Sequence, residues 1–430
     1  MSILQHEKEV NPWIDAVEQK IWILMQVWAE VRFNFAFFNQ VPDLDWDQEV
    51  KNSIPRILAS EDKASFYTLL QELVAKLNDG HTFIMPPLEE MESLDHPAIE
   101  LEMIDNKIIV TRVGNNAENE RYGIKPGLEV TKVNGVNAIE YLEDKFVRYY
   151  SGGTKHWGYA YGLSRFLDGP KNSVVKLRLK SLDDKIMDVE SSRYSELCDG
   201  TRFKARIFDY DPLVEKRIID DVVYFRFSTF IFEEIVEEFA EKLGQIDLGS
   251  IRGMILDVRY NTGGNSDNVF KLLSLLIDEP VKTAMWRTRK YLPAYMSWGE
   301  PEEWHEEESG WIQPAQGKRY SGPLIVLAGH HTASAAEDFL VPLKYSKRSK
   351  IIGDVTAGST GNPVTVQLLG GYFLRVCSKH DSFPDGEEFV GIGIQPDILI
   401  KNTQKDVAEA RDVVLLKAFK VIKDWENMFN

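Results

Sequence analysis

Strands and helices alternate along the second half of the chain, and this alternation is the feature that most restricts the fold. From about residue 217, four strongly apolar runs read as buried strands: VVYFRFS, MILDVRY, PLIVLAG and SKIIGDV. Amphipathic segments separate them: IFEEIVEEFAEKL, NVFKLLSLLI and SAAEDFLVPLKY. Buried strands that are joined through helices are typical of a sheet covered by helices. We therefore predict an α/β layer structure for this half of the chain.

The first 200 residues read differently and divide into two regions. Up to about residue 95, apolar residues recur at three- and four-residue steps in IDAVEQKIWILMQVWAEV and in ASFYTLLQELVAKL, which predicts helices on either side of a VPDLDWDQ turn. From about residue 97, IIVTRV, GIKPGLEVTKVNGV and SVVKLRLKSL alternate apolar and polar residues, which predicts short strands. We expect an α/β (α+β) multidomain chain with a helical region at 1–95, a small β domain at 96–195 and an α/β domain at 196–430.

Length and charge exclude several classes of protein. A chain of 430 residues, 43% of them hydrophobic, is long enough for two or three packed domains and is not disordered. A formal net charge of −17 disfavours nucleic acid and anionic membranes as partners. Two cysteines, Cys198 and Cys377, are too few for a disulfide framework or a thiolate zinc site.

The chain carries no signal for a membrane or for secretion. No apolar run reaches the ~18–20 residues that a membrane-spanning helix needs. The amino terminus, MSILQHEKEVNPW, lacks the hydrophobic stretch of a secretory signal. We therefore expect a cytoplasmic protein from the chain as it stands, with export open for a trimmed chain.

Ser334 is the first candidate for chemistry. It lies in GHHTASAAEDFL, directly after an apolar strand and at the start of a helix. A hydroxyl there is exposed beside backbone N–H groups that favour a developing negative charge. The commoner role of a serine at such a junction is to cap the helix, and Thr332 or Ser334 fits that role too.

Two further segments join this candidate. ILDVRYNTGG ends a buried strand in Gly263 and Gly264, which suit either a loop whose amides face a substrate or an ordinary turn. LNDGHTF presents His81 after a helix, and imidazole is the side chain whose ordinary pKa suits a base near neutrality. His305 lies among glutamates in the polar excursion at 297–321, but the spacing matches no metal-ligand pattern. We therefore predict that the protein needs neither a metal nor an organic cofactor.

The order of these segments resembles the tail-specific, or C-terminal processing, serine protease family, and within it the branch similar to the tricorn protease core. Six landmarks carry the resemblance: VWAEVRFNFAFFNQVPDLDWD with LNDGHT, the IIVTRV…GIKPGLEVTKVNGV block, LDVRYNTGG, TASAAEDF, IIGDVTAGSTGNP and GIGIQPDI. The resemblance implies that the β domain is PDZ-like. It also implies that the α/β domain has a crotonase/ClpP-like fold.

The resemblance also implies roles for individual residues. Ser334 matches the nucleophile, and the N–H of Ala335 with that of Gly263 or Gly264 matches the oxyanion hole. The processing proteases carry a lysine base where this sequence has Ser359, so the implied base is His81, as in the tricorn-like branch.

The third member of that branch's catalytic set has no direct match. Gly80 stands where the branch has a serine beside its histidine, and Val390 stands near the place of its distal glutamate. The neighbouring carboxylates are Glu388, Glu387 and Asp385, of which we rank Glu388 first.

The family resemblance implies a serine endopeptidase that hydrolyses peptide bonds, near the C-termini of unfolded proteins or peptides. In that case the PDZ-like domain captures an extended peptide by strand addition. The alternative is a degenerate, binding-only member for peptides or apolar ligands, since retinoid-binding proteins of the eye resemble the same catalytic fold. Retention of both Ser334 and His81 favours the enzyme, and the sequence leaves the oligomeric state open.

Overall fold

The computed structural model describes residues 16–425, so the amino-terminal segment considered above for a secretion signal lies outside the described residues. Three helices open this part: α1 (Val17–Asn34), α2 (Trp46–Leu58) and α3 (Lys63–Ala75). α1 and α3 fall where the apolar periodicity predicted helices. The turn predicted at VPDLDWDQ ends sooner than expected, because Asp45 caps α2 by accepting a hydrogen bond from the Gln48 N–H.

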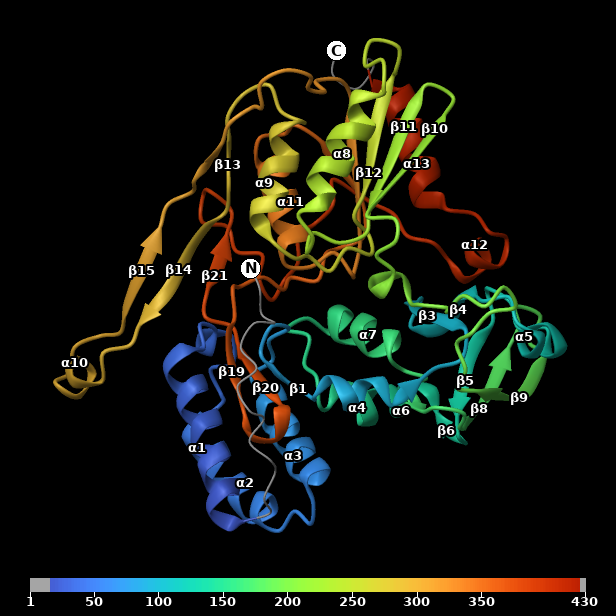
Figure 1. The fold of residues 1–430 in the computed structure, drawn as a ribbon. Helices are drawn as coiled ribbons and strands as arrows, with labels where there is room; N and C mark the ends of the chain where they lie inside the picture. The colour runs from blue at the N-terminus through green and yellow to red at the C-terminus, as the bar shows by residue number, and fades with distance from the viewer. Residues whose placement is uncertain (1–15, 426–430) are drawn as a thin grey trace.

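Residues 99–192 contain a six-stranded sheet with its own hydrophobic core. Its strands are β3 (Ile99–Ile104), β4 (Lys107–Val113), β5 (Glu129–Val133), β8 (Val174–Lys180) and β9 (Ile186–Ser192), in the spatial order β3-β4-β5-β8-β9. β6 (Val136–Asn137) pairs with β5. Helices α5 (Ala117–Tyr122), α6 (Ala138–Leu142) and α7 (Lys155–Ser164) accompany it, and α7 lies against the edge strand β3 (Figure 1).

The α/β domain is built on a six-stranded sheet, and the predicted layer structure is confirmed. The spatial order is β10 (Val214–Ile219), β11 (Val222–Phe227), β12 (Gly253–Asp257), β17 (Leu324–Ala328), β18 (Lys350–Gly353) and β22 (Ile398–Leu399). All pairs except β10–β11 are parallel. Alternate side chains of these strands face two different cores, as the period of two in a strand requires.

Helices cover both faces of this sheet (Figure 1). α8 (Glu234–Gly244), α9 (Ser266–Ser274) and α11 (Ala335–Tyr345) pack on one face, and α13 (Val413–Lys423) packs on the other. Several short elements lie outside these layers: α4 (Leu88–Glu92), β2 (Leu94–Asp95), β7 (Gly169–Pro170), β13 (Val281–Lys282), β16 (Trp311–Ile312) and α12 (Gln404–Ala408). Within residues 16–425, no helix combines the length and the apolar character that crossing a membrane demands.

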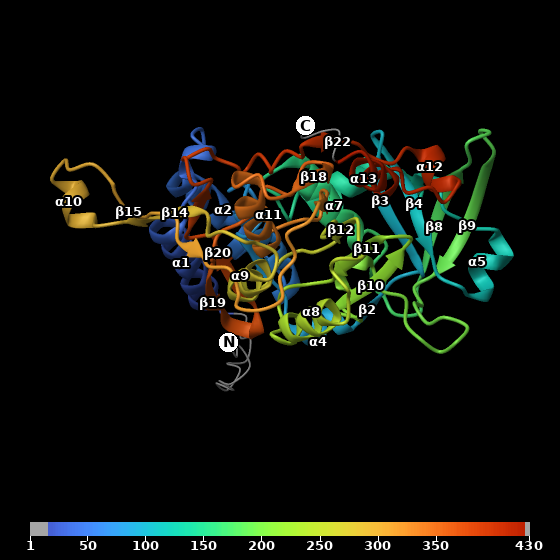
Figure 2. The ribbon, with the colours of Figure 1, turned by 90° about the horizontal axis from the view of Figure 1, so that it is seen from above.

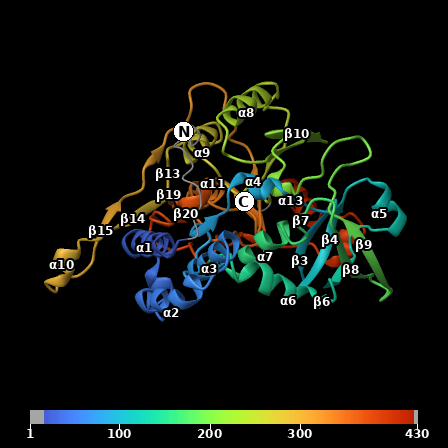
Figure 3. The same ribbon diagram turned by 60° about the horizontal axis from the view of Figure 1, so that its bottom comes forward.

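The amino-terminal helices share one hydrophobic core with the α/β domain. β1 (Phe83–Met85) pairs antiparallel with β20 (Phe373–Val376), which also pairs with β19 (Val364–Gln367). Figure 3 shows β19 and β20 beside α1, and Figure 1 shows β1 between β20 and the rest of the chain, close to α3. This pairing fixes the segment before β1, which contains His81, against the carboxyl-terminal part of the chain.

The first part of the polar excursion at 297–321 belongs to a projecting arm, which spans residues 285–307. β14 (Met285–Lys290) and β15 (Glu303–Glu307) pair antiparallel around α10 (Pro293–Ser297), and β21 (His380–Ser382) joins them at the base. The arm extends away from the rest of the molecule (Figure 2). Its strands were missed because their faces are defined by contacts such as the Arg287 guanidinium over the Trp304 ring, and not by apolar alternation.

Candidate active site

Ser334 adopts a backbone conformation that aims its side chain away from the helix it precedes. It occupies the N-cap position of α11 with φ 56° and ψ −128°, and its side chain makes no capping hydrogen bond. Positive φ is uncommon for a residue other than glycine and marks a constrained position. The Ser334 N–H donates to the Ser359 carbonyl oxygen at 2.7 Å. The alternative in which the Ser334 hydroxyl caps the helix is therefore wrong.

His81 lies between the hydroxyls of two serines. Its Nε2 is 3.1 Å from Ser334 Oγ and its Nδ1 is 2.7 Å from Ser359 Oγ. Burial, together with the nearby Arg375 and Lys379, lowers the pKa of His81 to about 3. The imidazole is thus neutral near pH 7, with one nitrogen donating a hydrogen bond and the other accepting one.

Ser359 belongs to the loop that follows β18, and this loop is held by a buried carboxylate. Glu337 Oε2 accepts the Ser359 N–H at 2.8 Å, and Oε1 accepts the Gly358 N–H at 2.9 Å. Glu337 lies in the first turn of α11 and is fully buried. The family resemblance implied a lysine base at the position of Ser359, and nothing in the sequence indicated that the Ser359 hydroxyl lies against His81.

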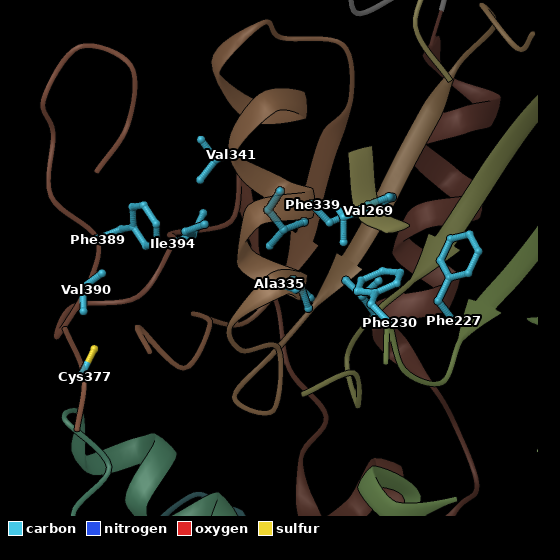
Figure 4. Packing of buried hydrophobic residues seen from close by; sticks show 14 of the residues in the cluster. Phe227, Phe230, Val269, Ala335, Phe339, Val341, Cys377, Phe389, Val390 and Ile394 are labelled. Atoms are coloured by element: carbon cyan, nitrogen blue, oxygen red, sulfur yellow. The ribbon is translucent and has the colours of Figure 1, made fainter. Parts of the chain in front are cut away.

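The helix that carries Ser334 is fixed by buried aromatic packing. Phe339 of α11 stacks on Phe230, with ring centroids 5.6 Å apart, and lies beside Val269 of α9 (Figure 4). Close packing of this kind holds the first turn of α11 in a single position. Ser334 therefore sits on a rigid element.

The glycine pair lies against Ser334, and its two N–H groups differ. Gly263 has φ 102°, and a Cβ there would come within 2.7 Å of Ser334 Cβ and 2.8 Å of Ala335 N. The Gly263 N–H already donates to Asn261 Oδ1 at 2.9 Å. Among residues 16–425, neither the Gly264 N–H nor the Ala335 N–H has a hydrogen-bond partner. Two backbone donors are thus free next to the serine.

The carboxylates ranked from the sequence do not reach His81. Glu388 is exposed and contacts Arg287 Nη2 at 3.1 Å and His380 Nε2 at 3.3 Å. Asp385 and Glu387 are exposed on the same loop, while Val390 is buried in the core (Figure 4). The expectation that Glu388 orients His81 is therefore not met, because the loop turns its acidic residues toward solvent and its apolar residues inward. The partner of His81 Nδ1 is a hydroxyl.

Three other histidines, at positions 305, 330 and 331, have partners away from Ser334. His330 Nε2 lies 3.2 Å from Asp354 Oδ2, and His331 is buried between the rings of Tyr260 and Trp157. His305 lies on the arm and contacts Glu307 at 3.0 Å. Across the described residues, no three His, Cys, Asp or Glu side chains form a group that could hold a metal ion.

Comparison with known proteins identifies a family that part of the chain resembles. Residues 221–400 match the family model described as Peptidase family S41. The resemblance to the C-terminal processing proteases is thereby confirmed for the matched part of the chain, residues 221–400, which is similar to peptidase family S41.

Curated relatives carry related names. The chain is 24% identical over 361 residues to the carboxy-terminal processing protease CtpB of Bacillus subtilis, which covers 82% of this chain and 66% of that protein. It is 23% identical over 305 residues to a probable CtpA-like serine protease of Staphylococcus haemolyticus, with 71% and 52% covered. The chain thus matches between about half and two thirds of the length of these relatives.

Solved structures share the fold over nearly the whole chain. Mature CPAF aligns with a TM-score of 0.77 at 16% identity, over 96% of this chain and 98% of that chain. The photosystem II D1 C-terminal processing protease aligns with a TM-score of 0.55 at 17% identity, over 94% and 97%. Both likenesses support the mixed α/β multidomain architecture.

Proposed function

We propose that the protein is a serine endopeptidase in which Ser334 is the nucleophile and His81 is the general base. The single observation that carries this proposal is the 3.1 Å contact between Ser334 Oγ and His81 Nε2. A serine hydroxyl becomes a useful nucleophile when a positioned base removes its proton. His81 fits that role because its depressed pKa keeps Nε2 free to accept a proton.

The proton follows a simple path. His81 Nε2 takes the proton of the Ser334 hydroxyl as Oγ attacks the substrate carbonyl carbon, and the imidazolium returns it to the leaving amine. Water then attacks the acyl-enzyme, again with His81 as the base. Ser359 Oγ accepts the Nδ1–H of His81, so Ser359 is the positioning residue that selects this tautomer. The proposed catalytic set is therefore Ser334, His81 and Ser359, and it contains no carboxylate.

The oxyanion of the tetrahedral intermediate would be bound by the N–H groups of Gly264 and Ala335. Both are free of other partners among the described residues, and the Ala335 N–H points out of the start of a helix. The sequence led us to expect the N–H of Gly263 or Gly264 in the oxyanion hole, and Gly263 contributes in another way. Its N–H is engaged by Asn261, and its missing side chain allows the close approach to Ser334.

The substrate class rests on the names of the relatives, which are carboxy-terminal processing proteases. We therefore propose unfolded proteins or peptides as substrates, cleaved near their C-termini. Residues 99–192 would form the PDZ-like domain, with β3 as the edge strand for peptide addition.

The first half of β3 is covered in this structure. α7 packs against β3, and residues 203–206 cover the strand edge: Arg206 donates to both Glu100 and Glu102, and Phe203 is buried near Ile99. The cavity beside Ile99 and Glu100 is about 10 Å³, too small for a peptide, whereas a cavity of about 370 Å³ lies beside Glu102, Met103 and Ile104. Strand addition along the whole of β3 would require residues 203–206 to move.

A serine-reactive fluorophosphonate probe tests the proposal. The probe bonds covalently to an activated serine Oγ and releases fluoride, so labelling of the wild-type protein at Ser334, lost in Ser334→Ala and strongly reduced in His81→Ala, is expected. A protein that stays unlabelled and binds an apolar ligand tightly would support the carrier alternative instead. That alternative is disfavoured because the serine and the histidine are paired.

A further inference from the structure

Glu337 lies one turn into the serine helix, and its side chain reaches across to the loop that carries Ser359. Its carboxylate accepts three hydrogen bonds from that loop: from Thr356 Oγ1 at 2.5 Å, from the Gly358 N–H at 2.9 Å and from the Ser359 N–H at 2.8 Å. Thr356 Oγ1 in turn accepts the Ile394 N–H at 2.7 Å. Three donors of this loop segment thus converge on one buried carboxylate, while the Thr356 and Ala357 N–H groups donate to the carbonyls of Ile394 and Thr332.

These bonds close a ring around the proposed nucleophile. The Ser334 N–H donates to the Ser359 carbonyl at 2.7 Å, the Ser359 N–H donates to Glu337, and the Glu337 N–H donates to the Ser334 carbonyl at 2.7 Å. The distance from His81 Nδ1 to Ser359 Oγ therefore depends on where the Glu337 carboxylate holds the loop.

The ionised form of the Glu337 carboxyl group is disfavoured at this buried position. Glu337 is fully buried and its hydrogen-bond partners are neutral groups. Burial, and to a lesser degree the charge of Asp338, raises the pKa of Glu337 to about 7. A buried carboxyl group that served packing alone could be replaced by an apolar or amide side chain without this disadvantage.

We infer that Glu337 is a positioning residue for the proposed hydrolysis: it fixes Ser359 so that the hydroxyl orients His81 toward Ser334. The inference rests on the proposed function. Glu337 touches neither His81 nor Ser334 through its side chain, so it acts through Ser359. An ionised carboxylate suits the three donors, whereas an amide at the same place would turn its NH₂ toward at least one of them.

The test is a double-mutant cycle between Glu337→Gln and Ser359→Ala, measured with a peptide substrate well above pH 7. Each single variant should lower kcat about 10-fold with KM nearly unchanged, the factor expected for one lost hydrogen bond. The double variant should be within about twofold of either single variant, because both remove the same interaction. Asp338→Asn is the matched control: it lies in the same helix turn but its carboxylate binds Ser266 Oγ at 2.6 Å, so kcat should stay within about twofold of wild type.

Several outcomes would overturn the inference while leaving the proposed function intact. Losses that multiply in the double variant would show that Glu337 does not act through Ser359, and an unchanged kcat in Glu337→Gln would show that it does not act at all. Retained activity in Ser334→Ala would instead remove the proposed function itself. If Glu337→Gln fails to fold, Thr356→Val removes one of the three donors, and its expected loss of about threefold should likewise vanish in the Ser359→Ala background.

Discussion

The nearest hydrogen-bonding partner of His81 Nδ1 is the hydroxyl of Ser359, at 2.7 Å. A hydroxyl can fix the tautomer of an imidazole but carries no charge to stabilise the imidazolium. We therefore expect Ser359 to contribute much less to kcat than Ser334 and His81 do.

Ser334 and His81 should behave as one unit. Ser334→Ala and His81→Ala should each lower kcat by about 10⁴-fold or more. The Ser334 hydroxyl is a weak nucleophile without a base, and His81 has no nucleophile to activate without Ser334. The double variant should be at most about threefold worse than either single one. Steady-state kinetics on a peptide substrate measure this, and multiplied losses would separate His81 from the mechanism.

Substitution of Ser359 should lower turnover, whereas substitution of Glu388 should not. Ser359→Ala should lower kcat about 10-fold, far less than loss of the base, since one neutral hydrogen bond is removed. Glu388→Gln should change kcat/KM by about twofold or less, because its carboxylate is exposed and paired with Arg287. A collapse of activity in Glu388→Gln would restore the carboxylate assigned from the sequence.

As the pH is lowered, kcat/KM should fall first because Glu337 is protonated, and only at much lower pH because His81 is protonated. As the pH falls through about 7, Glu337 takes up a proton, can no longer accept all three hydrogen bonds, and kcat/KM should fall. Its carboxylate faces the neutral donors of the loop, and the only charged group that acts on its pKa among the described residues is Asp338 on the same helix. Protonation of His81 should appear only near pH 3.

The control for that profile is Glu337→Gln. This variant should lose the limb near pH 7 and keep a flat profile down to the acid range. A limb near pH 6.5 that persists in Glu337→Gln would assign the titration to a histidine with an ordinary pKa.

Gly263 should tolerate no side chain. Gly263→Ala should lower kcat/KM by about 100-fold or more, since the new Cβ would push against Ser334 Cβ and displace the nucleophile. Gly135→Ala is the matched control, because its φ of 86° is also positive but no atom lies within 4 Å. It should cost about 1 kcal/mol of stability and leave turnover intact.

Peptide capture at β3 should be limited by the covering segment. In a Ser334→Ala background, a fluorescent peptide with a free C-terminus should bind weakly, and Phe203→Ala with Arg206→Ala should tighten binding. Fluorescence anisotropy measures both, with an amidated peptide as the control. Equal, tight binding before and after the substitutions would mean that peptides bind elsewhere.

The sequence predicted the layers of the α/β domain because β11, β12, β17 and β18 are mostly apolar and alternate with amphipathic segments, a pattern typical of a covered sheet. α2 was missed because it begins in an Asp-rich stretch that reads as a turn and contains Pro55. Ser334 and His81 were found through their motifs. Ser359 and Glu337 were not assigned roles, because their importance depends on hydrogen bonds between segments more than 20 residues apart.

One signal for Glu337 was present in the sequence. It is a charged residue on a helix whose neighbours Ala336, Phe339 and Leu340 are apolar, and such a residue is either exposed or held by specific partners. The choice between Gly263 and Gly264 had no comparable signal, since it depends on which N–H the Asn261 side chain engages.

The pairing of β1 with β20 also determines when the site can form. His81 and Ser334 are 253 residues apart, and the strand that anchors the histidine segment lies within the last 60 residues of the sequence. A growing polypeptide on the ribosome contains both side chains 39 residues before β20 begins. Under the proposed function, a chain that stops short of β20 should lack the strand that anchors the His81 segment and should therefore be inactive.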